Sequence, residues 1–85
     1  MKFRLYTKAD CPYCHAAVAL LAEHQKEFEQ YGLDRQPELL TEIQNTYNWR
    51  TVPVVVEITA GQEKFIGGFT DLKEYLNKGK QLLKG

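Results

Sequence analysis

The sequence predicts an α/β protein in which a strand, a helix and a second strand are followed by a helix, a strand hairpin and a last helix. Three observations carry this prediction. A β-branched and aromatic run at residues 3–7 leads into an alanine- and leucine-rich segment, residues 51–66 hold two β-prone runs around a short turn, and apolar residues recur at helical spacing in three segments. The long crossover between the first two strands implies parallel pairing with a right-handed connection.

Length and composition predict one small soluble domain over residues 1–85. A chain of 85 residues buries only about 60–65% of its unfolded surface, so no second domain is expected. Eleven basic and eleven acidic side chains are interspersed and give zero formal net charge, which predicts neither a nucleic-acid nor a membrane partner. Apolar residues form no run long enough to span a bilayer. We expect a monomer.

The first strand is expected to begin at Met1 and to reach Thr7. Large side chains occupy both sets of alternating positions, which is typical of a central strand covered on both faces. Because the sequence opens with this strand rather than with an apolar signal or a transit segment, we expect a cytoplasmic location. In such a reducing compartment an isolated Cys-x-x-Cys pair beside a βαβ pattern is more often redox-active than structural.

The two cysteines lie in the turn between the first strand and the first helix. Pro12 is expected at the first helical position, where its missing N–H costs nothing, and this makes Cys11 the N-cap. A thiolate there accepts free N–H groups, expected from Tyr13 and Cys14, and gains from the positive end of the helix dipole. Asp10 opposes the thiolate unless its side chain points into solvent.

The helix pattern predicts unequal roles for the two sulfurs. Val18, Leu21 and Ala22 follow Cys14 at helical spacing, so Cys14 is expected on the core side and Cys11 at the exposed tip. Disulfide exchange needs one accessible thiol that attacks and one shielded thiol that resolves the mixed disulfide. The pattern therefore favours Cys11 as the nucleophile.

A zinc site and a structural disulfide are the alternatives for this pair. His15 and His24 are the candidate zinc ligands, but both lie on the same expected helix as Cys14, and neither makes a spacing typical of zinc. A structural disulfide fits less well still, because no secretory segment precedes the pair. Redox exchange is the interpretation that we favour.

The middle of the chain predicts a weak strand and an amphipathic helix. The first helix is expected to fade over residues 24–27, and residues 28–33 form the second strand. Pro37 is expected at the first position of the next helix, which ends near Asn48, and Trp49 is interpreted as a packing residue at that end. The apolar stripe of this helix is Leu39, Leu40, Ile43 and Tyr47.

The last third predicts a hairpin and a helix. Residues 51–58 and 63–66 are β-prone around a turn at residues 59–62, with Pro53 at the start of the first strand because it cannot donate to a ladder. Thr70 is expected as the N-cap of the final helix, with Asp71 in its first turn. Leu72, Tyr75 and Leu76 are expected to face inward, and the helix ends at Gly79 or continues as a short tail through Leu82 and Leu83.

Three motifs in this order resemble the glutaredoxin family, specifically the dithiol CPYC type within the thioredoxin superfamily. They are Cys11-Pro12-Tyr13-Cys14, Thr51-Val52-Pro53 and Gly67-Gly68-Phe69-Thr70-Asp71-Leu72, and the match covers nearly the whole chain. The resemblance implies a thioredoxin-like fold, a four-stranded mixed sheet flanked by three helices in the order βαβαββα.

The resemblance also implies an enzyme, a glutathione-dependent thiol-disulfide oxidoreductase that reduces protein disulfides and glutathione mixed disulfides. Cys11 would attack, Cys14 would resolve, and glutathione would restore the dithiol as reducing co-substrate, with no metal expected. The implied partners are glutathione and disulfide-containing or glutathionylated proteins, with ribonucleotide reductase as a candidate. The implied roles are electron transport and cell redox homeostasis.

The same resemblance implies a glutathione site. Pro53 would be cis and lie against the active-site disulfide, while Val52 would offer its backbone N–H and C=O to the cysteinyl part of glutathione. The free carboxylate of the γ-glutamyl group would meet the helix N-terminus at Thr70, and its ammonium would meet Asp71. The full implied set is Lys8, Tyr13, Thr51, Val52, Pro53, Gly68, Phe69, Thr70 and Asp71.

Some of these residues also have an ordinary structural interpretation. Lys8, expected near the glycine carboxylate, is equally a solvated loop lysine, and Thr70 and Asp71 would cap a helix whether or not glutathione bound. Many family members add a basic or amide side chain from the second helix at the glycine carboxylate. No single residue here aligns to that role, and the candidates are Arg35, Gln44 and Arg50.

Two rival functions stay open on the sequence alone. One is a glutaredoxin-like electron donor for ribonucleotide reductase that is recharged by thioredoxin reductase, against which Lys8, Thr70 and Asp71 argue. The other is a non-enzymatic module that binds a metal or carries a cluster with glutathione. Pro12 directly after the nucleophile does not fit the cluster-binding branch of the family.

Overall fold

The computed structural model describes the backbone of residues 2–84 and the side chains of residues 2–77. The expected start of the first strand at Met1 and the side chains of Leu82 and Leu83 lie outside the described part. In chain order the elements are β1 (Lys2–Thr7), α1 (Pro12–Glu23), β2 (Phe28–Gly32), α2 (Pro37–Tyr47), β3 (Val54–Thr59), β4 (Gln62–Gly67) and α3 (Phe69–Lys84).

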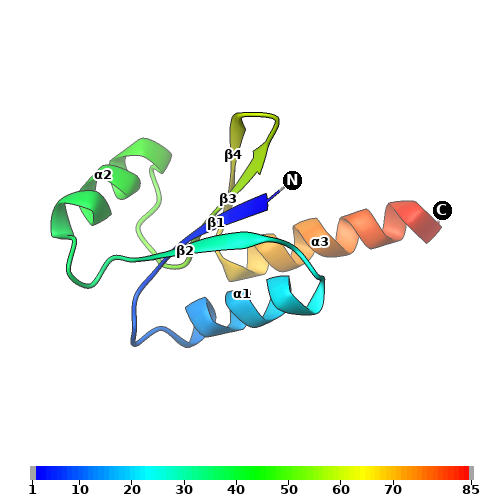
Figure 1. The fold of residues 1–85 in the computed structure, drawn as a ribbon, viewed down its shortest axis with the longest axis horizontal. Coiled ribbons are helices and arrows are strands. Elements are labelled where there is room, and N and C mark those ends of the chain that lie inside the picture. Colours follow the sequence, from blue (N-terminus) through cyan, green and yellow to red (C-terminus); the bar gives the residue numbers. More distant parts are fainter. Residues whose placement is uncertain (1, 85) are drawn as a thin grey trace.

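The strands form one mixed sheet in the order β2-β1-β3-β4. The pairing of β1 with β2 is parallel, whereas β1 with β3 and β3 with β4 are antiparallel. β1 is therefore a central strand, as the large side chains at both sets of alternating positions predicted. The four-stranded mixed sheet with three helices is the thioredoxin-like fold that the sequence predicted (Figure 1).

Helices cover both faces of the sheet and create two apolar clusters. Figure 1 shows α1 and α3 together on one face, while α2 lies on the other face near one end of the sheet. The cluster beneath α1 and α3 contains Phe3, Leu5, Ala17, Leu21, Val55, Leu72 and Leu76. The cluster beneath α2 contains Tyr6, Leu33, Ile43, Val54 and Val56. Within the described residues, no helix is long and apolar enough to cross a membrane.

Strand direction brings three distant segments to one end of the sheet. β1 runs toward Thr7 and the cysteine turn, and Tyr6 near its end pairs with Val54 at the start of antiparallel β3. β4 returns along β3 until Gly67 pairs with Val55. Consequently the β1–α1 loop, the segment before β3 and the start of α3 meet at the same edge.

The outer ends of the two hairpin strands differ from the prediction. β3 begins at Val54 rather than at residue 51, so Pro53 precedes the strand, and β4 continues through Gly67. The turn is a two-residue one in which Ala60 and Gly61 have φ of 52° and 81°. Positive φ at both central positions is the geometry of a type I′ turn, whose twist matches that of the strands.

Two helix predictions were wrong, Thr70 as the N-cap of the last helix and Ala22 on the core side of the first, whereas the alternative that the last helix continues past Gly79 is confirmed. α3 begins at Phe69, which places Thr70 inside the first turn rather than at the N-cap, and the helix continues through Gly79 to Lys84. On α1 the buried residues are Cys14, Ala17 and Leu21, whereas Ala22 is exposed. α2 begins at Pro37 and ends with Asn48 at the C-cap, as predicted, and its single fully buried residue is Ile43.

Candidate active site

Cys11 is the N-cap of α1, as predicted from Pro12 at the first helical position. It has extended φ and ψ of −130° and 102°, and its Sγ accepts the N–H of Cys14 at 3.1 Å. The carbonyl oxygen of Cys11 accepts the N–H groups of Cys14 and His15 at 3.1 and 3.2 Å. The Cys14 N–H is thus shared between the sulfur and the carbonyl oxygen of Cys11, and its bond to the sulfur at the helix N-terminus favours negative charge there.

The predicted exposure of Cys11 was wrong, because both thiols are buried. Cys11 is 8% exposed and Cys14 is 2% exposed, and neither is in a disulfide. Val52, in the segment before β3, lies against Cys11: the thiol of Cys11 donates to the carbonyl oxygen of Val52 at 3.6 Å. The two thiols therefore differ only in how deeply they are buried, and neither is an exposed thiol.

Cys14 is held in its protonated form. Burial, followed by the hydrogen bond with Cys11, raises the pKa of Cys14 to about 12, and the charge of Asp34 adds to the rise. The backbone N–H of Lys8 acts in the opposite direction. At neutral pH Cys14 is thus a thiol, and it loses its proton only as it reacts.

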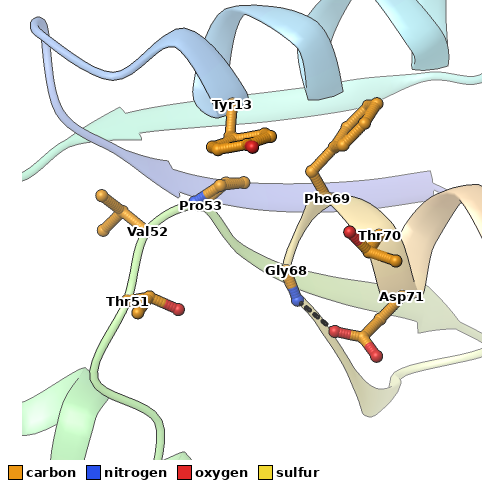
Figure 2. A pocket seen from close by; sticks show the side chains of 8 residues that line it. All are labelled: Tyr13, Thr51, Val52, Pro53, Gly68, Phe69, Thr70 and Asp71. Atoms are coloured by element: carbon orange, nitrogen blue, oxygen red, sulfur yellow. Dashed lines mark hydrogen bonds between the residues drawn. The ribbon is translucent and has the colours of Figure 1, made fainter.

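A pocket of about 250 Å³ lies next to the cysteine turn: Tyr13 of that turn lines it, as does Val52, whose carbonyl oxygen accepts the Cys11 thiol, but neither cysteine is a lining residue. Figure 2 shows the segment from Thr51 to Pro53 on one side, Gly68 to Asp71 on the other, and the Tyr13 ring over Pro53. The peptide bond between Val52 and Pro53 is cis, as the family resemblance implied. The lining residues are Tyr13, Thr51, Val52, Pro53, Gly68, Phe69, Thr70 and Asp71.

Two aromatic rings form the apolar part of this wall. Tyr13 is 63% exposed, which is high for so large an apolar ring, and its centroid lies 6.0 Å from that of Phe69 with the rings tilted by 35°. Trp49 packs edge-on against Phe65 with ring centroids 5.4 Å apart, and its Cζ2 lies 3.6 Å from the position that a Cβ would take on Gly68 of the wall. Trp49 is thus a packing residue, as the sequence suggested.

The polar part of the wall is the beginning of α3. The Asp71 carboxylate accepts the N–H of Gly68 at 3.0 Å (Figure 2). This is the reciprocal half of a capping box, in which the third helical residue reaches back to the N-cap N–H. Gly67 precedes this turn with φ of 128°, a conformation that favours glycine.

The structure does not bring every candidate residue to this pocket. Lys8 is half-buried in the β1–α1 loop but is not among the lining residues. Arg35 borders a separate hollow at the start of α2, whereas Gln44 and Arg50 border a third hollow at its end. The Asp10 side chain is exposed, which is the condition under which it opposes a Cys11 thiolate least.

The histidines proposed as zinc ligands have other surroundings. His15 Nε2 lies 3.1 Å from the carbonyl oxygen of Ala9, and His24 is the C-cap of α1, at the far end from Cys11. Within the described part of the chain, no three His, Cys, Asp or Glu side chains gather as a metal site would require.

Asp34 is a residue near the site that sequence reasoning treated only as part of a loop. Its Oδ2 accepts the N–H of Ala9 at 2.9 Å, across 25 positions of sequence. No local pattern announces this bond, because it depends on how the β2–α2 loop folds back beside the cysteine turn.

The comparison with known families decides the assignment. The family model for glutaredoxin matches residues 4–60. The chain belongs to the glutaredoxin family. As a glutaredoxin, it is a thiol-disulfide oxidoreductase, and the match spans the cysteine turn and the cis-proline segment.

Individual relatives agree with this family. A glutaredoxin of Pseudomonas aeruginosa is 37% identical over 76 residues, which cover 89% of this glutaredoxin and 86% of the relative. The solution structure of a glutaredoxin from Brucella melitensis is 33% identical, covers 95% of this chain and 84% of that one, and superposes with a TM-score of 0.76.

The glutaredoxin-like protein NrdH-redoxin of Escherichia coli, described as having a thioredoxin-like activity profile, is also similar to this glutaredoxin. It is 31% identical and covers 84% of this chain and 87% of that one, with a TM-score of 0.63.

Proposed function

We propose that this protein uses glutathione to reduce glutathione mixed disulfides and protein disulfides. The observation that carries the proposal is the pocket of about 250 Å³. One of its lining residues, Val52, accepts the thiol of Cys11 through its carbonyl oxygen. Its opposite wall offers a helix N-terminus and a carboxylate, which suit the charged γ-glutamyl end of a small peptide. Its aromatic and proline surfaces suit the uncharged part.

With a glutathionylated protein, the reaction needs only Cys11. The Cys11 thiolate attacks the glutathione sulfur, a bond forms between these two sulfurs, and the protein thiolate leaves and takes a proton from water. The thiolate of a second glutathione then attacks the bound glutathione sulfur. The bond between this sulfur and Cys11 Sγ breaks, glutathione disulfide leaves and Cys11 returns as a thiolate, so that in sum one glutathione is oxidised for each protein thiol released.

With an intramolecular protein disulfide, Cys14 completes the exchange. Cys11 first forms a mixed disulfide with the protein, and Cys14 then attacks Cys11 Sγ, so that the reduced protein leaves and the disulfide between Cys11 and Cys14 forms. Because the pKa of Cys14 is raised to about 12, its proton must be lost during this step. Two glutathiones afterwards restore the dithiol and become glutathione disulfide.

The deciding experiment compares two reductants on the same protein. Turnover of a small glutathione mixed disulfide is measured with glutathione plus glutathione reductase, and separately with thioredoxin reductase. We expect turnover with glutathione, and Cys11→Ser serves as the inactive control. Turnover with thioredoxin reductase alone would overturn the proposal.

The second candidate is the electron donor for ribonucleotide reductase that is recharged by thioredoxin reductase. The similarity to NrdH-redoxin of Escherichia coli favours it. The carboxylate of Asp71 in the pocket wall argues for glutathione instead, because a donor recharged by a protein needs no site for a peptide ammonium. The reductant comparison above separates the two.

A cluster-carrying module is the remaining alternative. The ultraviolet-visible spectrum of freshly isolated protein tests it directly, since an iron–sulfur cluster absorbs where the thiol protein does not. We also propose the cytoplasm as the location, because an isolated Cys-x-x-Cys pair beside a βαβ unit is typical of redox-active proteins of a reducing compartment.

A further inference from the structure

Ala9, in the loop between β1 and α1, is held from two sides by side chains. Its N–H donates to Asp34 Oδ2 at 2.9 Å, and its carbonyl oxygen lies 3.1 Å from His15 Nε2. Since a carbonyl oxygen only accepts, this second bond requires a proton on Nε2, which both the neutral Nε2–H tautomer and the charged ring supply. Both polar groups of Ala9 are thus satisfied by side chains rather than by regular secondary structure.

The two holding residues stand on fixed parts of the fold. Asp34 directly follows Leu33, which is 2% exposed and whose N–H donates to the carbonyl oxygen of Thr7 at 2.8 Å. His15 lies in the first turn of α1, with its N–H bonded to the carbonyl oxygen of Cys11. One anchor therefore belongs to the end of the sheet and the other to the helix that carries the thiols.

Besides the backbone of Lys8, which hydrogen-bonds Cys14, little else holds the loop between these anchors. Ala9 and Asp10 are exposed, so residues 8–10 bury few apolar groups, and such segments open most easily. Cys11 follows only two residues after Ala9. As the N-cap, Cys11 accepts the N–H of Cys14 with its Sγ, and this geometry depends on where the loop places the Cys11 backbone.

We propose that Asp34 and His15 form a clamp on Ala9 that positions Cys11 for attack. They are positioning residues, since their recorded bonds are to Ala9 and not to the reacting sulfur. The inference rests on the proposed function only for the role of Cys11 as the attacking thiol. The clamp should affect every substrate alike, because it fixes the position of Cys11 and not the shape of the glutathione pocket.

The rate at which iodoacetamide alkylates Cys11 in a Cys14→Ser background measures the reactivity of the Cys11 thiol without glutathione. The Cys11 thiolate displaces iodide, the S–C bond forms, the C–I bond breaks, and the thiol proton goes to water. The bond from the Cys14 N–H to Cys11 Sγ favours the reactive thiolate, and a loosened loop would weaken this bond, which should slow alkylation about three- to tenfold. We expect Asp34→Ala and His15→Ala each to slow alkylation by that factor.

The sign of the Asp34 effect separates positioning from electrostatics. If the Asp34 carboxylate acted only as a nearby negative charge, both Asp34→Ala and Asp34→Asn would favour the thiolate and speed alkylation. A clamp predicts that Asp34→Asn, whose amide oxygen still accepts, stays within about twofold of the parent while Asp34→Ala slows it. His15→Gln, which keeps a donor, should likewise recover most of the rate that His15→Ala loses.

Two matched controls and one double variant complete the test. Glu42→Ala removes an exposed acid from α2, and His24→Ala removes the other histidine of the chain, and both should alkylate at the parent rate. Because both clamp residues act through Ala9, the combined variant should be slowed at least about twofold less than the product of the single effects.

Amide exchange in the unsubstituted protein gives an independent measurement. The Ala9 N–H should be protected relative to that of its exposed neighbour Asp10. Equal exchange of the two amides, unchanged or faster alkylation in Asp34→Ala, or fully multiplicative single effects would each overturn the clamp. Failure of glutathione turnover in the parent would instead overturn the proposed function, while the alkylation results would still report on the clamp.

Discussion

The Asp71 carboxylate accepts the backbone N–H of Gly68 at 3.0 Å, three residues back along the chain. This bond closes the turn between β4 and α3 and satisfies one N–H at a helix end. The same side chain lines the pocket that borders Cys11 through Val52. The start of α3 and the proposed recognition of glutathione therefore depend on one carboxylate.

The first prediction concerns Gly67, which brings the chain into this turn. A Cβ at Gly67 would lie 2.5 Å from Asp71 Oδ2, and φ of 128° is strained for any residue with a side chain. We expect Gly67→Ala to lower the free energy of unfolding by about 1–3 kcal/mol. Gly32→Ala is the control, because nothing lies within 4 Å of its Cβ position. Urea unfolding of both variants measures the difference, and equal stabilities would contradict the prediction.

The second prediction separates the structural and binding roles of Asp71. If the carboxylate pairs with the ammonium of glutathione, Asp71→Asn should raise the KM for glutathione about tenfold, since removing one partner of a charge-assisted bond costs about 1.5–3 kcal/mol, less where water enters. If it only stabilises the helix start, stability falls by a few tenths of a kcal/mol, about the value of a dipole interaction, and kinetics stay unchanged.

Glu74→Gln is the matched control for this measurement, because Glu74 is an exposed acid on the same helix. It should leave the KM for glutathione at the parent value. An unchanged KM in Asp71→Asn would remove Asp71 from the binding site and strengthen the thioredoxin-reductase alternative.

The third prediction concerns the unequal cysteines. Cys11 is the N-cap whose thiol donates to Val52 of the pocket wall, and Cys14 is the deeper and protonated thiol. Cys11→Ser should abolish every exchange activity. Cys14→Ser should keep the reduction of glutathione mixed disulfides and lose most reduction of intramolecular protein disulfides. Assays with both substrate types test the assignment, and equal losses in the two variants would refute it.

The fourth prediction follows from the raised pKa of Cys14. In the unfolded chain its pKa is near 9.0, whereas in the folded protein it is about 12. Between these values the unfolded chain binds fewer protons than the folded one, so stability must fall as pH rises. The stability is fully present below about pH 9 and is lost toward about pH 12, with a slope of at most about 1.4 kcal/mol per pH unit from this one group.

The measurement is urea unfolding of the fully reduced protein at pH 8, 9, 10 and 11. Cys14→Ala is the comparison, because it keeps every tyrosine and lysine that also titrates in this range. The stability advantage of the parent over this variant should shrink with each step above pH 9. A constant difference across the range would show that Cys14 titrates alike in the folded and unfolded protein.

The sequence by itself determined the elements and the thiol chemistry. β-prone runs and helical periodicities predicted the strands and helices in their order, although not the starts of β3 and α3, because strand and helix formation impose local preferences and periods on the chain. Pro12 predicted Cys11 as the N-cap, since proline at the first helical position is favoured for local reasons. The motif order identified the family, and the family match agrees.

Only the tertiary structure decided how deeply Cys11 is covered, where α3 begins, and what holds the cysteine loop. Val52 covers Cys11 and Asp34 reaches Ala9 from segments 41 and 25 positions away. The sequence predicted Thr70 as the N-cap. In the structure the Asp71 carboxylate accepts the N–H of Gly68, and the helix begins at Phe69. These features depend on which segments the sheet brings together, and local propensity carries no information about such contacts.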